Sequence, residues 1–120
     1  NLQDEIPEHP ELPGRSCAPV LVGDELDWDE EITFHEYENT RTVRTAGWKY
    51  TRRFPGGPGD FYDMQNDPAE RKNMIDLPET AAVRRRLGSR LGTFFKRYSE
   101  PSYDLWQGET SKAHRCIPGP

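Results

Sequence analysis

Acidic side chains gather in one short stretch of the sequence, where their chemistry would be that of a metal site. The stretch contains Asp24, Glu25, Asp27 and Asp29. Carboxylate oxygens are the ligands that Ca²⁺ prefers, but an EF-hand loop also needs a central glycine and a terminal glutamate at fixed positions. The spacing here does not match, so solvated surface carboxylates are the favoured interpretation.

No other catalytic pattern is present in the sequence. His9, His35 and His114 are the three histidines and lie far apart, with no zinc spacing and no order typical of a catalytic triad. The glycine-rich residues 55–59 lack the lysine and the following helix of a phosphate-binding loop. Cys17 and Cys116 could form one bridge or remain free thiols, and both alternatives stay open.

Residues 60–73 predict a strand that stops abruptly. Phe61 and Tyr62 point to opposite faces of a strand, and Pro68 removes a backbone donor and ends it. We expect Asp67 to act as the acceptor of an N-capped turn and Glu70 to reach back as in a capping box. We interpret this pattern as structural, and its residues do not match any known catalytic arrangement.

The same residues resemble the C-terminal part of formylglycine-dependent (arylsulfatase-like) sulfatases, in the alkaline phosphatase superfamily. The resemblance rests on Phe61-Tyr62-Asp63-Met64, Asn66-Asp67-Pro68-Ala69-Glu70 and Asn73-Met74. Residues 43–50 resemble the preceding strand pair, and residues 14–16 with 19–23 resemble the segment that joins the catalytic and C-terminal domains. The order and spacing of these pieces cover the chain to about Tyr98.

The resemblance implies sulfate-ester hydrolysis by a complete enzyme that uses a formylglycine nucleophile and calcium. The family's Cys-x-Pro-x-Arg motif is absent here, because Cys17-Ala18-Pro19 begins similarly but Leu21 stands where arginine is required. We therefore expect no catalytic and no metal residue in this chain, with the formylglycine and the calcium in an upstream catalytic segment. A phosphodiesterase or phosphonate hydrolase of the same superfamily is one alternative, and a stand-alone interaction module is another.

The resemblance also implies that this region shapes the substrate cleft for a sulfated small molecule or saccharide. His35 could form a hydrogen bond with the substrate, and Trp48 could stack on a sugar. The cations that could steer an anionic sulfate ester are Arg41, Arg44, Lys49 and Arg52. The competing interpretations are that His35 is paired with a neighbour, that the strand charges are solvated, and that Trp48 belongs to the core.

The composition of the chain limits the classes of protein to which it can belong. The chain has 120 residues, a net charge of −5 and 32% hydrophobic residues, so it forms one small domain with a thin core. The acidic balance argues against a nucleic-acid partner, and no apolar run is long enough for a membrane span. A secreted, periplasmic or lysosome-like compartment agrees with the resemblance, and the cytoplasm also remains open.

The elements that must position these residues form an α+β subdomain. Period-two alternation and turn residues predict four short strands within residues 32–64, joined as an antiparallel meander with a tight turn at Ala46-Gly47. One C-terminal helix follows, with Asp76 as its cap, Pro78 in its first turn and Gly88 and Gly92 close to the sheet. Its apolar stripe consists of Val83, Leu87, Leu91, Phe94, Phe95 and Tyr98.

The predicted organisation is a linker over residues 1–30, in which Val20 and Leu21 pack, a sulfatase subdomain over 31–98 and an irregular tail over 99–120. A sheet covered on only one face leaves aromatic side chains without partners. The chain also begins at Asn1 without an initiator methionine. We therefore expect a larger catalytic chain as partner, as in a heterodimer or processed enzyme, and an interface above about 1,000 Å². The side chains expected in that interface are Trp28, Phe34, Tyr37 and Trp48.

Overall fold

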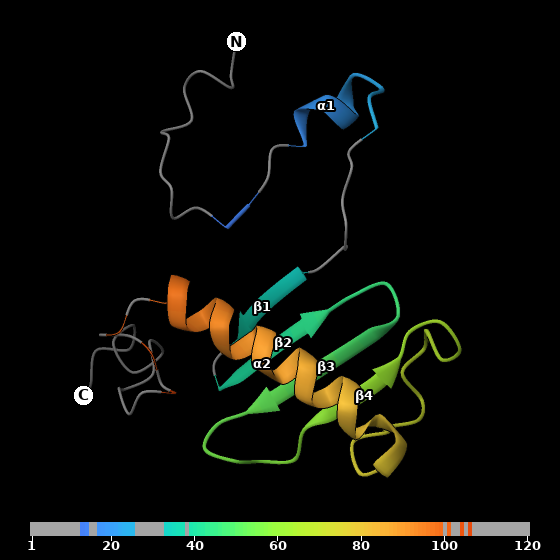
Figure 1. Ribbon diagram of the computed structural model, residues 1–120, viewed down its shortest axis with the longest axis vertical. Coiled ribbons are helices and arrows are strands. Elements are labelled where there is room, and N and C mark those ends of the chain that lie inside the picture. Colours follow the sequence, from blue (N-terminus) through green and yellow to red (C-terminus); the bar gives the residue numbers. More distant parts are fainter. Residues whose placement is uncertain are drawn as a thin grey trace, which may run out of the picture.

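The computed structural model describes residues 13–14, 17–25, 33–37, 39–99, 101, 104 and 106. It contains a four-stranded antiparallel sheet of order β1-β2-β3-β4 and a long C-terminal helix (Figure 1). The elements are α1 (Ala18–Leu21), β1 (Thr33–Tyr37), β2 (Thr40–Arg44), β3 (Trp48–Arg53), β4 (Asp60–Asp63), η2 (Pro78–Thr80) and α2 (Ala81–Tyr98). The predicted α+β fold is confirmed.

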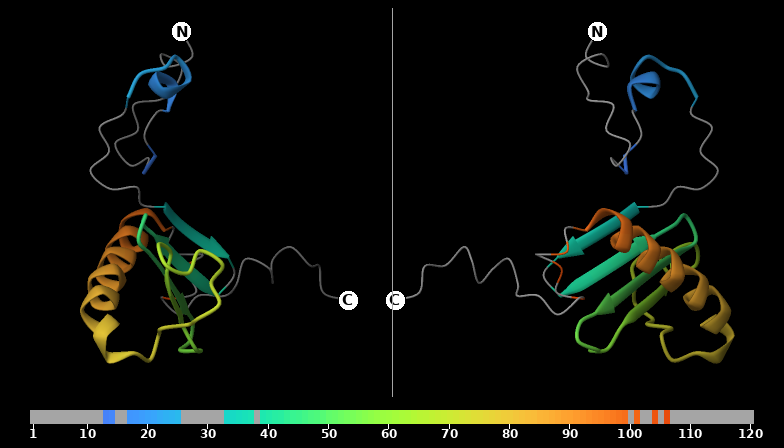
Figure 2. Two further views of the ribbon diagram at one scale, coloured as in Figure 1. Left: turned by 90° about the vertical axis from the view of Figure 1, so that its right-hand side faces the viewer. Right: turned by 60° about the vertical axis from the view of Figure 1, so that its left-hand side comes forward.

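The strand register divides the side chains between two faces. One row across the sheet consists of Phe34, Val43, Tyr50 and Phe61, and the adjacent row on the opposite face consists of Thr33, Arg44, Lys49 and Tyr62. Residues directly opposite each other point to the same face, and neighbours along a strand point to opposite faces. Helix α2 covers the first face, while no described helix or strand covers the second (Figure 2).

The predicted β2–β3 hairpin forms around Ala46-Gly47. The backbone N–H of Thr45 donates to the carbonyl of Trp48 at 2.8 Å, and the N–H of Trp48 donates to the Thr45 hydroxyl at 3.0 Å. Two hydrogen bonds therefore close the turn, and no helix occurs among residues 33–37 and 39–54.

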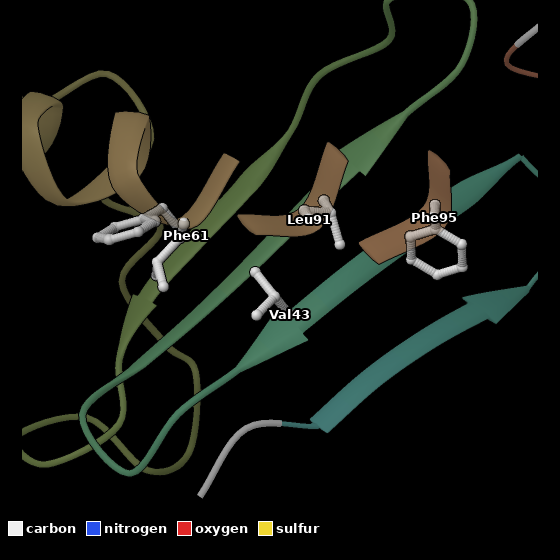
Figure 3. Close-up of a cluster of buried hydrophobic side chains, with 5 residues drawn as sticks. Val43, Phe61, Leu91 and Phe95 are labelled. Carbon is white, nitrogen blue, oxygen red and sulfur yellow. The ribbon is translucent and has the colours of Figure 1, made fainter. Parts of the chain in front are cut away.

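The core lies between α2 and the first face of the sheet. Its buried side chains are Val43, Phe61, Leu87, Leu91 and Phe95; Figure 3 labels four of them, gathered between the strands and the helix. Phe34 stacks on Phe94 with ring centroids 3.9 Å apart and extends this layer to β1. The predicted apolar stripe of the helix therefore packs as expected.

The start of the helical region differs from the prediction that Asp76 caps it. The first turn is the 3₁₀ helix η2, which follows the extended residue Leu77, and no side-chain cap is present there. Pro78 lies in that turn as predicted, and Glu79 follows it there. The hydroxyl of Thr80 donates instead to the carbonyls of Met74 and Leu77, at 3.1 and 2.8 Å. Because the helical turn begins after Leu77, Asp76 precedes the capping position.

Only one of the two helix glycines lies close to the sheet. A Cβ added at Gly88 would lie 3.3 Å from Cε1 of Tyr50, whereas a Cβ at Gly92 would have no atom within 4 Å. The prediction of a close approach is therefore correct for Gly88 and wrong for Gly92, which is exposed.

This difference predicts opposite outcomes for two alanine substitutions. Gly92→Ala should raise the free energy of unfolding by about 0.5–1 kcal/mol, since alanine favours the helix and nothing opposes its methyl group. Gly88→Ala should give a smaller gain or a loss, because Tyr50 must move. Urea unfolding of both variants measures the difference, and equal gains would contradict the close contact.

The side chains expected to face a partner lie in different environments. Phe34 and Trp48 are on the helix-covered face and pack against the core cluster, which corrects the expectation that they lack intramolecular partners. Tyr37 is 72% exposed, and Trp28 lies outside the described residues. Val20 and Leu21, expected to pack, are exposed, because α1 buries no residue.

Candidate functional site

The uncovered face of the sheet carries polar and charged side chains. Arg44 and His35 are exposed there, and Lys49 and Tyr62 are half-buried. At its centre the hydroxyls of Thr42 and Thr51 lie 2.8 Å apart and hydrogen-bond to each other. Cations and hydrogen-bond donors on a rigid sheet can bind an anionic partner. We call this surface, with Arg44, Lys49, His35 and Tyr62, the polar face.

Lys49 on the polar face is held by Glu70 from the loop after β4. Its Nζ lies 2.8 Å from both carboxylate oxygens of Glu70. Glu70 has φ +53°, in the left-handed region that non-glycine residues rarely adopt. This backbone strain costs on the order of 1–3 kcal/mol and persists where surrounding contacts impose it. Arg44, in contrast, is exposed and has no ion pair among the described residues.

The contacts that impose this conformation come from aspartates of the 60–73 stretch. Asp63 accepts hydrogen bonds from the backbone N–H groups of Gln65 and Asn66, both at 3.0 Å, and from the Asn66 side-chain amide at 2.8 Å. Asp67 accepts from the N–H of Lys72 at 2.7 Å. The residues that carry the sulfatase resemblance therefore build a hydrogen-bonded loop.

The capping-box prediction for this loop is wrong. Asp67 acts as an acceptor, as expected, but no helix follows it and Glu70 turns towards Lys49 instead of reaching back. Since the left-handed backbone at Glu70 interrupts any helical turn, the carboxylate projects over the polar face and pairs with Lys49.

Asn73 attaches the end of the loop to β4. Its Oδ1 accepts from the N–H groups of Phe61 and Ile75, and its Nδ2 donates to the carbonyl of Gly59 and to Asp60. Three of these four hydrogen bonds satisfy backbone groups, of which the Phe61 N–H belongs to the edge strand β4. Asn73 therefore fixes the loop that presents Glu70.

Both loop aspartates have a pKa below the ordinary value. For Asp63 the main cause is the hydrogen bond from the Asn66 side chain, followed by the Asn66 backbone; for Asp67 it is the backbone N–H of Arg71, followed by that of Lys72. Hydrogen bonds to the charged form favour ionisation.

The lowered pKa values predict acid sensitivity of this loop. Because the folded pKa lies below the unfolded one, the ionised carboxylates stabilise the fold fully above pH of about 4, and this contribution is lost as pH falls through the folded pKa. Urea unfolding from about pH 6 to about pH 2 should show stability falling on acidification, with a shallower slope in the Asp63→Asn, Asp67→Asn double variant. Identical slopes would contradict the assignment.

Arg41 lies on the helix-covered face and is engaged within the chain. Its guanidinium contacts Glu36 and Asp104, each at 2.7 Å, and the hydroxyl of Ser99 at 3.2 Å. It also lies over the ring of Phe95, 4.2 Å from the centroid. Arg41 and Asp104 are both buried, so this ion pair joins the sheet, the helix and the tail.

The structure does not bring the three predicted substrate-binding residues together. His35 is exposed on the polar face, whereas Arg41 is buried on the opposite face. Trp48 is half-buried there and stacks on Phe61 with centroids 5.1 Å apart. Substrate contact by these residues stays a prediction, and His35 is the one whose side chain is accessible.

Sequence reasoning missed the roles of Glu70 and Asp104. The signal for Glu70 was present, since its stretch carried the resemblance, but its partner Lys49 lies 21 positions earlier in the sequence. Asp104 stands 63 positions after Arg41. No local periodicity predicts pairs so distant in sequence.

A shallow groove of about 310 Å³ lies beside β1 and α2. Phe34, Phe94 and Tyr98 contribute aromatic faces, and Arg90 and Arg97 contribute guanidinium groups. The groove combines apolar contact with positive charge, and the sequence alone did not predict it because its lining comes from distant elements.

No group of three or more potential metal ligands occurs within the part of the chain that the structure describes. Of the acidic stretch, Asp24 and Glu25 are described, whereas Asp27 and Asp29 lie outside. In the same residues, no helix has the length and apolarity to cross a membrane.

Comparison with known proteins finds sulfatases among the proteins that this chain resembles. No family model matches the chain. Over 84 residues, 61% of the chain, it is 34% identical to the Δ4,5-hexuronate-2-O-sulfatase of Bacteroides thetaiotaomicron. It superposes with a TM-score of 0.67 and 28% identity on a structure from the same species assigned to the sulfatases, covering 80% of this chain and 22% of that chain.

Two further solved structures have a similar fold. A 2-O GAG sulfatase gives a TM-score of 0.65 at 28% identity, with 80% of this chain and 22% of that chain covered. The phosphonate monoester hydrolase of Agrobacterium radiobacter gives 0.58 at 20% identity, covering 82% of this chain and 24% of that chain, which shows the shared fold. The chain is therefore similar to sulfatases in sequence and in fold, and it spans 17% of the length of the curated relative.

Proposed function

We propose that the chain is the C-terminal part of a sulfatase that hydrolyses sulfate esters of an acidic saccharide. The observation that carries this proposal is the 34% identity to a hexuronate-2-O-sulfatase over 84 residues. The fold is also similar to that of a 2-O GAG sulfatase, at a TM-score of 0.65 and 28% identity. In this proposal the nucleophile, a formylglycine, and calcium belong to a catalytic segment or chain, and this part completes the fold and lines the cleft.

The polar face supports a role in shaping the cleft. Glu70 balances Lys49 and Asp60 lies 2.6 Å from Arg53, so the exposed Arg44 contributes charge that no described carboxylate neutralises. A sulfated, uronic acid-containing saccharide is polyanionic, and such a cation attracts it over several ångströms. The contribution of this chain is electrostatic guidance and positioning, with bond cleavage in the catalytic part.

A phosphonate hydrolase is the second candidate, because its structure shares the fold at a TM-score of 0.58. Its sequence identity of 20% is lower than the 28% of the 2-O GAG sulfatase. Fold alone does not assign chemistry. The higher identity therefore favours the sulfate ester as substrate.

The experiment is an assay of the protein purified from its source together with any catalytic polypeptide that accompanies it. Three substrates are compared: a 2-O-sulfated Δ4,5-unsaturated uronic acid disaccharide, an aryl sulfate and a phenyl phosphonate monoester. We expect sulfate release from the disaccharide with the highest kcat/KM. Preferred hydrolysis of the phosphonate would establish the second candidate. No hydrolysis, together with a cooperatively melting isolated chain, would establish a stand-alone module.

A further inference from the structure

Helix α1 has a fully formed end although it is only four residues long. Gly23 adopts the left-handed conformation, with φ +92°. Its N–H donates to the carbonyl of Val20 at 3.1 Å, and the N–H of Asp24 donates to that of Pro19 at 3.0 Å. These two bonds form the Schellman motif that ends a helix. The side chains of the turn therefore have fixed directions.

A helical turn this short is not stable by itself in water. Nucleating a helix fixes several backbone dihedrals for one hydrogen bond, so isolated short helices are unfavourable. Packing against another surface normally supplies the missing stabilisation. No residue of α1 is buried, and Figures 1 and 2 draw it apart from the sheet and α2.

The exposed side chains of this turn are apolar. Val20 is 51% exposed, Leu21 81% and Val22 78%, and together with Tyr37 they are the large hydrophobic residues exposed in the described part of the chain. Asp24 and Glu25 follow immediately and are polar and exposed. Three successive apolar side chains exposed beside charged residues are a feature of interaction surfaces.

We propose that Val20, Leu21 and Val22 dock into an apolar pocket on the catalytic part of the same sulfatase-like protein. This inference rests on the proposed function. The chain spans 17% of the curated relative and 22% of the superposed sulfatase structure, so most of such a protein lies outside it. The superposition covers 80% of the chain, and residues 33–120 make up a smaller share of it than that. The superposition therefore includes residues that precede β1.

The experiment measures hydrogen exchange of the Gly23 and Asp24 amides in the complete protein. The variant is Leu21→Asp, and Leu21→Ala serves as a milder change. The matched control is Ala46→Asp, which places the same charge at an exposed turn on the subdomain. The Thr45 amide, bonded to the Trp48 carbonyl, reports whether the sheet remains folded.

We expect protected Gly23 and Asp24 amides in the wild type, and exchange roughly tenfold faster or more in Leu21→Asp, since a buried charge opens the docked turn. Leu21→Ala should give a smaller acceleration, and Ala46→Asp none, with Thr45 unchanged throughout. Wild-type exchange as fast as in a peptide of residues 13–25 would overturn docking. Equal protection in the isolated chain, or no difference between Leu21→Asp and Ala46→Asp, would overturn it as well.

Measuring the activity together with the amide protection distinguishes a failure of this inference from a failure of the proposed function. A wild type that cleaves the phosphonate but protects Gly23 and Asp24 would refute the sulfatase assignment and leave the docking surface in place. A wild type that cleaves the sulfate ester with unprotected amides would refute only the docking surface.

Discussion

Replacing Leu91 by alanine should lower the free energy of unfolding by about 2–5 kcal/mol. Leu91 is 2% exposed and lies between Leu87 and Phe95 on the face of α2 that covers the sheet. Truncation removes apolar burial and leaves a cavity beside Val43 and Phe61, which are fixed in strands and cannot collapse far into it. Urea unfolding should show a lower midpoint with an unchanged slope.

The control for this prediction is Lys96→Ala on the same helix. Lys96 is exposed, so its loss should change the stability by no more than about 0.5 kcal/mol. An effect of Leu91→Ala as small as that of the control would refute the packing of α2 on the sheet.

Replacing Arg41 by methionine should destabilise the protein by about 3–5 kcal/mol at neutral pH. Methionine keeps much of the length of the side chain above the Phe95 ring, so the main change is the loss of the positive charge. The Asp104 side chain, 1% exposed, then loses the ion pair with Arg41. Chemical unfolding at constant pH measures the loss.

Two further variants test the cause of this effect. Adding Asp104→Asn to Arg41→Met should recover part of the stability, because the second change removes the buried negative charge. Lys49→Met breaks an ion pair of similar length whose side chains are about one-third exposed, and it should cost only about 0–1 kcal/mol. Equal losses for Arg41→Met and Lys49→Met would show that burial does not determine the strength of these pairs.

Two ion pairs of the sheet involve residues for which the sequence had suggested other roles. Arg41, whose contact with a substrate stays a prediction, pairs with Asp104. Glu70 was expected to cap a turn and instead holds Lys49. Lys49–Glu70 lies on the polar face and Arg41–Asp104 on the covered face. The two ion pairs therefore lie on opposite faces of the sheet.

The sequence by itself determined the elements and their order. The alternation around Val43 and Tyr50, the Ala46-Gly47 turn and the stripe through Leu87, Leu91 and Phe95 predicted the sheet, its hairpin and the covering helix. These features depend on local periodicity and turn chemistry, which act over a few residues. The motif at residues 60–73 also carried the resemblance to sulfatases, and its side chains form the hydrogen bonds of the loop.

Only the tertiary structure decided which charges are available. Arg41 and Arg44 are three positions apart on one strand, yet an odd separation places them on opposite faces. The helix then buries the first beside Asp104, 63 positions away, and leaves the second exposed. Burial and pairing of a charge depend on elements brought together from distant positions. For that reason, residue type and spacing could not separate a structural arginine from an accessible one.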